Sequence, residues 1–288
     1  MDRRTFLGGS LALSATTFAG TLPELPLKFG HRQANMGVHP GEEVFALARR
    51  IRGLSGVELQ VMWKGQDLTQ RETALQYKRG ANRWAVEVPS LAGIWKPGES
   101  VYDRPIAERA IAGSVRAAEW IGASVILVAL YKKNCPDMQD EKSYAPLVSL
   151  FQKMGEQARG SGVVLGLETS LAPADDRKLI HLIAHSSVKT YFDATNVETD
   201  HPGQAIAGIG ILGADIVQCH LKNENPRLDQ KPAKVDWAVA CRRLQQVGFR
   251  GWHVFETRHA DTEACVRDTE ANIAFVRRTL SSNSPAAF

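Results

Sequence analysis

The sequence predicts a single-domain (β/α)8 barrel, and three observations lead to that prediction. Short apolar segments typical of buried strands alternate with segments of helical periodicity from residue 27 onward. Eight such strands occur in a chain of 288 residues, and a (β/α)8 barrel typically needs about 250. The first strand is followed by "RQANMG", which lacks the glycine-rich phosphate-binding loop of a doubly wound open sheet, the main alternative.

The predicted elements follow one another without a linker that would divide the chain. The expected strands are residues 27–31, 57–62, 84–90, 124–130, 163–168, 189–193, 216–220 and 252–256. Segments of helical periodicity separate them, among them residues 41–53, 107–122, 144–160 and 236–248. Each of these helical segments ends in glycine, which readily adopts the left-handed conformation at a helix C-terminus. We therefore expect one barrel over residues 27–280.

Composition and charge exclude several classes of protein. Apolar residues make up 44% and charged residues 23% of the chain, as in ordinary globular proteins. The formal net charge is only +4, and no Lys/Arg cluster has interleaved aromatic residues, so nucleic acid is not an expected partner. The four cysteines show no CxxC spacing, which argues against a zinc knuckle or a disulfide framework.

The N-terminus has the composition of an export signal. Residues 1–20 begin with charged residues and continue with small and mildly apolar ones, and "RRTFL" at residues 3–7 resembles the twin-arginine signal. Ala19 is suited to be the last residue before cleavage. We expect the twin-arginine export machinery to be a partner and the protein to be periplasmic, either soluble or lightly tethered to the membrane. Residues 281–288 read as a disordered tail.

Polar residues end each of the last four predicted strands. Side chains alternate between the two faces of a strand, so in residues 216–222 we expect Val217, Cys219 and Leu221 to face the helices. Ile216, Gln218, His220 and Lys222 should then face the lumen. The same alternation predicts that four inward residues meet at the carboxyl ends of the strands, where barrel active sites lie. They are Glu168, Asp193, His220 and Glu256.

Three carboxylates in a small lumen would repel one another and would be costly to desolvate. A divalent cation removes both problems, so these four residues are predicted to be metal ligands. Oxygen ligands with one nitrogen suit a fairly hard ion, with Mn²⁺ preferred and Mg²⁺, Co²⁺ or Zn²⁺ as alternatives. The competing interpretation is four separate rim residues, each paired with a lysine or an arginine.

The strand-end motifs resemble those of the xylose-isomerase-like sugar phosphate isomerase/epimerase superfamily, over roughly residues 27–280. They are "GVEL" (56–59), "GLET" (166–169), "YFDATN" (191–196), "HLKN" (220–223), "KVDW" (234–237) and "VFET" (254–257). The resemblance implies a (β/α)8 barrel with a Glu-Asp-His-Glu metal site. In its tagatose- and psicose-epimerase branch the two metal-bound glutamates are the acid/base pair, which here implies Glu168 and Glu256.

Two positions depart from that branch and leave the exact substrate open. Asn196 stands where the branch has a histidine, and Ala174 stands where it has a second glutamate. Arg227 follows His220 in the chain and matches the substrate-binding arginine of the superfamily. The candidate substrate-binding residues are Asn196, Lys222, Arg227, His31, Glu58 and Trp95. A rim salt bridge for Lys222, an exposed loop cation for Arg227 and core packing for Trp95 are the structural alternatives.

The expected function is that of a metal-dependent isomerase or epimerase, which moves a proton through an enediolate of a sugar or keto-sugar. One alternative is an exported metal-dependent hydrolase or lyase acting on glycosides or keto-glycosides. An endonuclease IV-like enzyme is a second, although the extra histidines of that class are missing. A non-catalytic sugar-binding barrel is a third. The expected partner is a small sugar, and homo-oligomer formation stays open.

Overall fold

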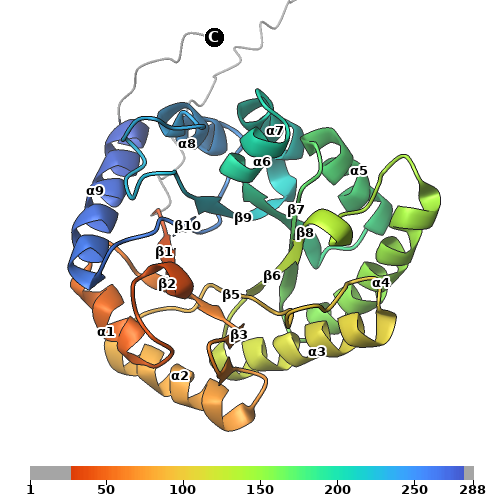
Figure 1. Cartoon of the computed structure of the whole chain (residues 1–288), viewed down its shortest axis with the longest axis horizontal. Helices are drawn as coiled ribbons and strands as arrows, with labels where there is room; N and C mark the ends of the chain where they lie inside the picture. The colour runs from red at the N-terminus through yellow and green to blue at the C-terminus, as the bar shows by residue number, and fades with distance from the viewer. Residues whose placement is uncertain (1–26, 282–288) are drawn as a thin grey trace, which may run out of the picture.

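The computed structural model describes residues 27–281. Within them, eight parallel strands close into a barrel in the order β1-β10-β9-β8-β7-β6-β5-β2 (Figure 1). The strands are β1 (Phe29–Arg32), β2 (Gly56–Gln60), β5 (Ser90–Ala92), β6 (Val125–Leu130), β7 (Val164–Thr169), β8 (Val188–Asp193), β9 (Ile216–Leu221) and β10 (His253–Phe255). The predicted (β/α)8 barrel is therefore confirmed. The predicted export signal, residues 1–20, lies outside the described residues.

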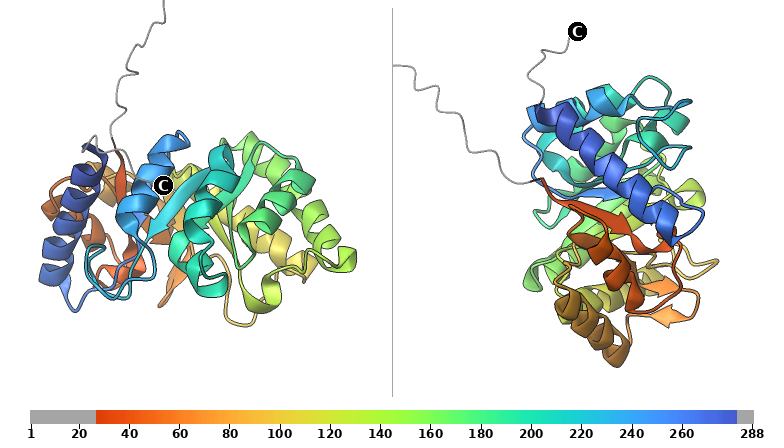
Figure 2. Two further views of the ribbon diagram at one scale, coloured as in Figure 1. Left: turned by 90° about the horizontal axis from the view of Figure 1, so that it is seen from above. Right: turned by 90° about the vertical axis from the view of Figure 1, so that its left-hand side faces the viewer.

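Helices surround the barrel, and β1 and β10 close it (Figures 1 and 2). The helices are α1 (Glu43–Arg50), α2 (Arg71–Trp84), α3 (Arg104–Ile121), α4 (Glu141–Gly160), α5 (Pro173–Ile183), α6 (Ala194–Asp200), α7 (Ala205–Leu212), α8 (Trp237–Gln246) and α9 (Thr262–Ser281). Because α9 includes Ser281, the predicted tail can only begin later, at residue 282, outside the described part. Within residues 27–281, no helix combines the length and apolar character needed to cross a lipid bilayer.

Local sequence signals explain where the helices begin and end. Asp103 caps α3 by accepting a hydrogen bond from the backbone N–H of Ile106, and Asp236 caps α8 in the same manner. At the other end of α3, Gly122 has a φ of 90°, a left-handed conformation that costs glycine little. Asp103 and Asp236 end two of the βα-loops, from which the upper rim of the barrel is built, whereas Gly122 begins the αβ-loop that leads to β6.

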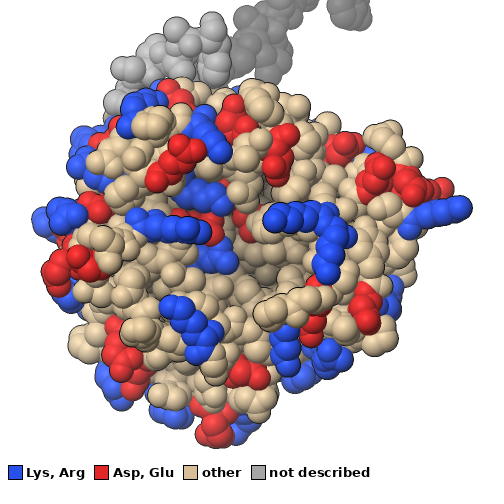
Figure 3. Space-filling view, viewed as in Figure 1, with Lys and Arg blue, Asp and Glu red and all other residues tan. Residues whose placement is uncertain are grey.

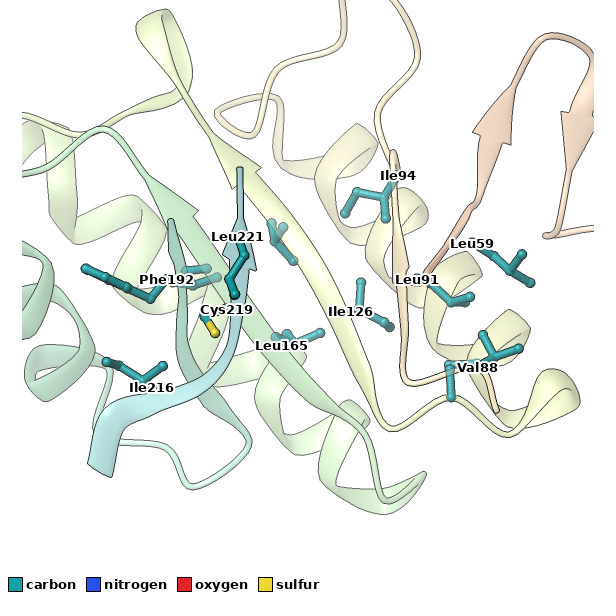
Figure 4. Close-up of a cluster of buried hydrophobic side chains, with 14 of the residues drawn as sticks. Leu59, Val88, Leu91, Ile94, Ile126, Leu165, Phe192, Ile216, Cys219 and Leu221 are labelled. Atoms are coloured by element: carbon teal, nitrogen blue, oxygen red, sulfur yellow. The ribbon is translucent and has the colours of Figure 1, made fainter. Parts of the chain in front are cut away.

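The apolar core lies mainly between the strands and the helices. Leu165, Phe192 and Cys219 belong to this layer, and the close-up in Figure 4 shows them on neighbouring strands. A smaller cluster fills the lumen, with Tyr191 packed against residues of β5 and β6. Polar strand-end residues thus stand on top of a packed lumen rather than over an open pore.

The third barrel strand is displaced from its predicted position. Helix α2 continues through Trp84 and ends where Ala85 adopts a left-handed conformation, with φ of 50°. The ladder of β5 begins only at Ser90, after a proline that has no N–H to donate. The valines of the predicted strand 84–90 are buried all the same. Before Ser90 this segment pairs with β2 at one isolated bridge, between Glu87 and Gly56, so the alternating pattern reports burial rather than a continuous ladder.

A bulge changes the predicted facing of β9 at its start. Thr190 pairs with Ile216 but the next residue, Tyr191, pairs with Gln218, so Val217 is the extra residue. As a consequence Ile216 joins the helix-side core and Val217 packs in the lumen, the reverse of the prediction. Beyond the bulge the predicted alternation holds, because Cys219 and Leu221 lie on the helix side.

Candidate metal centre

Four polar side chains from adjacent strands meet at the carboxyl end of the barrel. Glu168, Asp193 and His220 each place one donor atom within 4.8 Å of the others. His220 Nδ1 lies 3.3 Å from Glu168 Oε1 and 4.0 Å from Asp193 Oδ2. It also lies 3.5 Å from Oε2 of Glu256, which follows β10. The three carboxylates expected to bind a metal therefore surround one edge of the His220 imidazole.

Asp193 has two roles because it is both the last residue of β8 and the N-cap of α6. Its Oδ1 accepts hydrogen bonds from the backbone N–H groups of Thr195 and Asn196, each at 2.9 Å. Among the described residues, none donates a well-aligned hydrogen bond to its buried Oδ2, although Lys222 Nζ is 2.7 Å away. Capping therefore orients the carboxylate and leaves one oxygen for a cation.

The charges around this centre are not balanced by protein groups. The carboxylates are Glu58, Glu168, Asp193 and Glu256. Arg32 pairs with Glu256, and Lys222 lies 3.0 Å from Glu256 Oε2 as well as close to Asp193. These two cations leave two negative charges when His220 is neutral. A divalent ion would complete the balance, so the donor set fits the predicted hard metal in charge as well as in chemistry.

Shifted pKa values report the same demand for positive charge. Burial would lower the pKa of His220, but Glu58 and Glu256 raise it to about 10. Burial raises the pKa of Asp193 to about 6, despite the nearby Lys222 ammonium. Burial opposes ionisation of Glu256, yet His220 and Arg32 hold its pKa at about 2. Such divergent pKa values within one cluster are typical of functional sites.

Glu58 lies behind His220. Its Oε1 is 3.0 Å from His220 Nε2, and its Oε2 accepts hydrogen bonds from Ser90 Oγ at 2.8 Å and from the Tyr191 hydroxyl at 2.7 Å. Because a carboxylate can only accept, Glu58 holds a proton on His220 Nε2, and Nδ1, which faces Glu168, is the nitrogen that would lose its proton to bind a metal. Metal-binding histidines commonly have such a carboxylate partner.

A cavity of about 370 Å³ opens above the centre. Figure 3 shows lysine and arginine side chains around the hollow at the centre of this view. The lining residues are Arg32, Gly93, Ile94, Trp95, Leu127, Ala129, Tyr131, Lys132, Glu168, Ser170, Asn196, Asp200, Lys222 and Glu256. The volume is within the usual range for small-molecule sites.

Three predicted substrate contacts line this cavity. Trp95 donates its indole N–H to the carbonyl of Ala129 at 3.0 Å, which holds the ring as a wall. Asn196 Nδ2 lies 3.4 Å from both Glu168 Oε1 and the Tyr131 hydroxyl. Lys222 bridges two of the carboxylates, as described above. The polar groups of Asn196 and Lys222 therefore reach the edge of the metal centre.

The other three predicted contacts lie elsewhere. Among the described residues, the lining of this cavity includes neither His31, nor Glu58, nor Arg227. His31 shares the helix side of β1 with Phe29 and contacts His259, and Glu58 lies beneath His220. Arg227 forms an ion pair with Asp229 at 2.8 Å on the surface, because that carboxylate follows it in the same loop.

Arg32 and Tyr131 were missed by the sequence prediction. Phe29 is bulky and apolar, which indicates that it points toward the helices. Alternation along β1 then places His31 on the helix side and Arg32 in the lumen. Tyr131 directly follows β6, and burial raises the pKa of its phenol well above the ordinary value. A neutral hydroxyl thus lies beside Glu168. Strand β6 carries apolar residues up to this point, so no alternation of polar and apolar residues indicated that Tyr131 faces the cavity.

These observations define a (β/α)8 barrel with a candidate metal centre at the carboxyl ends of its strands. Residues 45–279 match the family described as xylose isomerase-like TIM barrel. The chain belongs to that family. A comparison with curated protein sequences gives no match.

Solved structures of the same fold include several sugar epimerases. A D-psicose 3-epimerase with D-tagatose from Clostridium cellulolyticum H10 has a TM-score of 0.73 at 13% identity, over 89% of this chain and 100% of that one. A 3-keto-D-glucoside 4-epimerase from E. coli has a TM-score of 0.66 at 17% identity, over 88% and 99%. A xylose isomerase domain protein from Planctomyces limnophilus has a TM-score of 0.69 at 17% identity, over 88% and 96%. At these identities the likeness shows the shared fold.

Proposed function

We propose that the protein is a metal-dependent epimerase of a sugar or keto-sugar. The observation that carries this proposal is the position of two carboxylates beside the candidate metal centre. Glu168 comes from β7 and Glu256 follows β10, with β8 and β9 between them in the barrel. Both line the same cavity. Two bases that approach one carbon from different sides can invert it.

Glu168, Asp193, His220 and Glu256 would hold the ion, for which Mn²⁺ suits the mixture of oxygen donors and one nitrogen donor. When bound, such an ion polarises a substrate carbonyl and stabilises the negative charge of an enediolate. The protein supplies the remaining parts. Glu58 orients His220, and the hydrogen bonds that cap α6 orient Asp193.

The environments of the two glutamates suggest how they divide the proton transfers. Glu256 pairs with both Arg32 and Lys222, which makes its carboxylate a weak base. Glu168 instead has the neutral amide of Asn196 at 3.4 Å and the phenol of Tyr131 nearby. Glu168 would therefore remove the proton beside the carbonyl and later release it to solvent, while Glu256 would pass a proton taken from solvent in the cavity to the other face of the carbon. Such general acid–base steps contribute about 10²–10⁴-fold each.

Several cavity residues are suited to bind the substrate. Arg32 and Lys222 present positive charge to substrate oxygens, while Tyr131 and Asn196 are neutral hydrogen-bonding groups. Trp95 provides an apolar wall for one face of a sugar ring. The cavity of about 370 Å³ suits one sugar unit. This mixture favours a small hydroxylated substrate over a polymer.

Turnover of a panel of keto-sugars and keto-glycosides in deuterated water tests the proposal. Wild-type protein loaded with Mn²⁺ should place one deuterium on the inverted carbon. Glu168→Gln and Glu256→Gln should reduce both exchange and turnover by about 10²-fold or more. Glu224→Gln, at an exposed position after β9, is the matched control and should behave as wild type.

Two outcomes would contradict the epimerase proposal. A cleaved glycoside formed without C–H exchange would favour the hydrolase or lyase alternative. Near-normal activity of both Glu→Gln variants would show that neither carboxylate transfers the proton.

A further inference from the structure

A second cluster of metal-binding side chains lies outside the cavity, where β1 meets the segment between β10 and α9. His31, His259 and Cys265 each offer one donor atom, and these atoms lie within 4.8 Å of one another. The side chains of His31 and His259 have no solvent exposure, and Cys265 is equally buried. His31 is far in the chain from His259 and Cys265, and closure of the barrel by β1 and β10 brings the three together.

The hydrogen-bonding partners of the two imidazoles determine where their protons are. His31 Nδ1 lies 3.1 Å from the carbonyl oxygen of Arg32. His259 Nδ1 lies 3.5 Å from Asp268 Oδ2. Carbonyl and carboxylate oxygens only accept hydrogen bonds. The His31 ring therefore carries its proton on Nδ1 and has a lone pair on Nε2. His259 Nδ1 forms no well-aligned hydrogen bond within the described residues, but a proton on this nitrogen would face the Asp268 carboxylate and would leave a lone pair on Nε2 here too.

Those two lone pairs face each other. His31 Nε2 and His259 Nε2 are only 3.2 Å apart. The hydroxyl of Thr257, 3.0 Å from His259 Nε2, can donate to that ring and still leaves the His31 lone pair without a proton. Two unprotonated ring nitrogens at this distance repel each other unless a positive charge lies between them. A proton on His259 Nε2 would remove this repulsion by donating to His31, but it would leave the His259 Nδ1 lone pair 3.5 Å from the Asp268 carboxylate. A cation between the two Nε2 atoms removes both conflicts.

A proton is a poor candidate for that charge. Burial and, to a smaller extent, the neighbouring His259 lower the pKa of His31 to about 3. Burial also lowers the pKa of His259, although Asp268 opposes this. Burial of both rings thus disfavours a proton between them, and the 3.2 Å separation of the two Nε2 atoms is the observation that calls for a cation.

We propose that His31, His259 and Cys265 bind a zinc-class divalent cation through the two Nε2 atoms and the thiolate. Two imidazoles and one sulfur are a borderline-soft donor set that Zn²⁺ and Co²⁺ accept readily. Zinc–nitrogen bonds of about 2.0–2.1 Å at a tetrahedral angle separate the two nitrogens by about 3.3 Å, close to the separation in the structure. The Cys265 thiol would lose its proton to solvent on binding.

The outer partners of the cluster support the same assignment. Asp268 behind His259 and the Arg32 carbonyl behind His31 are the acceptors that metal-bound histidines usually have on their second nitrogen. The site would fasten β1 to α9 at the seam that closes the barrel. It is separate from the cavity and does not rest on the proposed epimerase activity.

Cobalt absorption of the full-length, chelator-treated protein provides a specific test. The lumenal centre contains no sulfur, so a thiolate-to-Co²⁺ charge-transfer band reports on the second site alone. Wild type should develop this band and saturate it with at most two equivalents, because the lumenal centre also accepts Co²⁺, whereas a protein that lacks the lumenal centre should saturate it with one. His220→Ala should retain it. Cys265→Ser should lose it, whereas Cys241→Ser, at a buried cysteine of α8, should keep it.

A second variant tests the proposal independently in case the Cys265→Ser variant does not fold. His259→Gln keeps the thiol and should weaken Co²⁺ binding by more than the ~10–100-fold that loss of an outer partner costs. The proposal is overturned if folded wild-type protein shows no thiolate band. It is equally overturned if the band survives in a folded Cys265→Ser variant, or if His259→Gln binds Co²⁺ as wild type does.

Discussion

Glu58 shows how a buried carboxylate that does not line the cavity can position a metal-binding side chain of the candidate centre. It fixes the tautomer of His220 through Nε2, and Ser90 and Tyr191 hold it in place. Gln218 in turn donates hydrogen bonds to both Ser90 Oγ and the Tyr191 hydroxyl, at 2.7 and 3.1 Å. The lumen beneath the metal centre is therefore a connected polar network that positions one imidazole.

Replacing Glu58 with Gln should weaken Mn²⁺ binding by about 10–100-fold, the usual cost of losing an outer partner of a metal-binding histidine. The amide keeps the size and one acceptor oxygen but loses the charge. Calorimetric titration of chelator-treated protein measures the change. Glu87→Gln, at an exposed position, is the control. Equal Mn²⁺ affinity of the Glu58→Gln variant and wild type would rule out this positioning role.

Strand alternation made the four strand-end residues predictable, because Glu168, Asp193, His220 and Glu256 all follow clear apolar neighbours. The alternation gave the wrong result in β1, a short strand in which the side of a single apolar residue determines which side chains point into the lumen. In β1 the prediction chose His31, but Arg32 reaches the lumen. Contacts such as that of Tyr131 with Glu168 depend on loop paths, which residue patterns do not encode.

Helix α5 and strand β8 meet at an unusual buried carboxyl group. Asp176 in α5 is 5% exposed and accepts a hydrogen bond from Thr190 Oγ1 in β8 at 3.2 Å. Burial raises its pKa from 3.8 to about 7. A native state that holds this proton more tightly than the unfolded chain loses stability as pH rises between those two values.

Asp176→Asn should remove this pH dependence. Relative to the variant, the wild-type free energy of unfolding should fall from pH 4 to pH 8 by a few kcal/mol at most, since one pKa unit corresponds to about 1.4 kcal/mol. Urea denaturation at several pH values measures the difference. Asp175→Asn, at the neighbouring half-buried position, should retain the wild-type slope. Parallel pH profiles for wild type and Asp176→Asn would contradict the assignment.

At the level of elements, periodicity located most strands but not their ladders. Seven predicted strands overlap the observed ones substantially, whereas 84–90 shares only Ser90 with β5. The reason is that a buried apolar alternation also suits an extended segment leading to a strand. The bulge at Val217 was equally hidden, because bulges arise from the fit between neighbouring strands.

For the whole molecule, export stays a prediction of the N-terminal sequence, and we propose a periplasmic location. The twin-arginine route carries folded proteins, so the metal could be acquired before export, which matters because raw affinity favours Zn²⁺ and Cu²⁺ over Mn²⁺. Replacing Arg3 and Arg4 with lysine should abolish periplasmic accumulation in fractionated cells. An unchanged periplasmic yield would exclude this signal.

The central claim is that the carboxyl end of the barrel binds one hard divalent cation, and Mn²⁺ titration of the chelator-treated full-length protein tests it most directly. Wild type and Cys265→Ser should each bind one Mn²⁺ per chain, with a higher melting temperature because the ion binds only the native state. Asp193→Asn keeps a good helix cap but removes the charge of the ligand. This variant and the His220→Ala variant should each lose Mn²⁺ binding. Folded wild-type protein that binds no Mn²⁺ and shows no thermal shift would contradict the account.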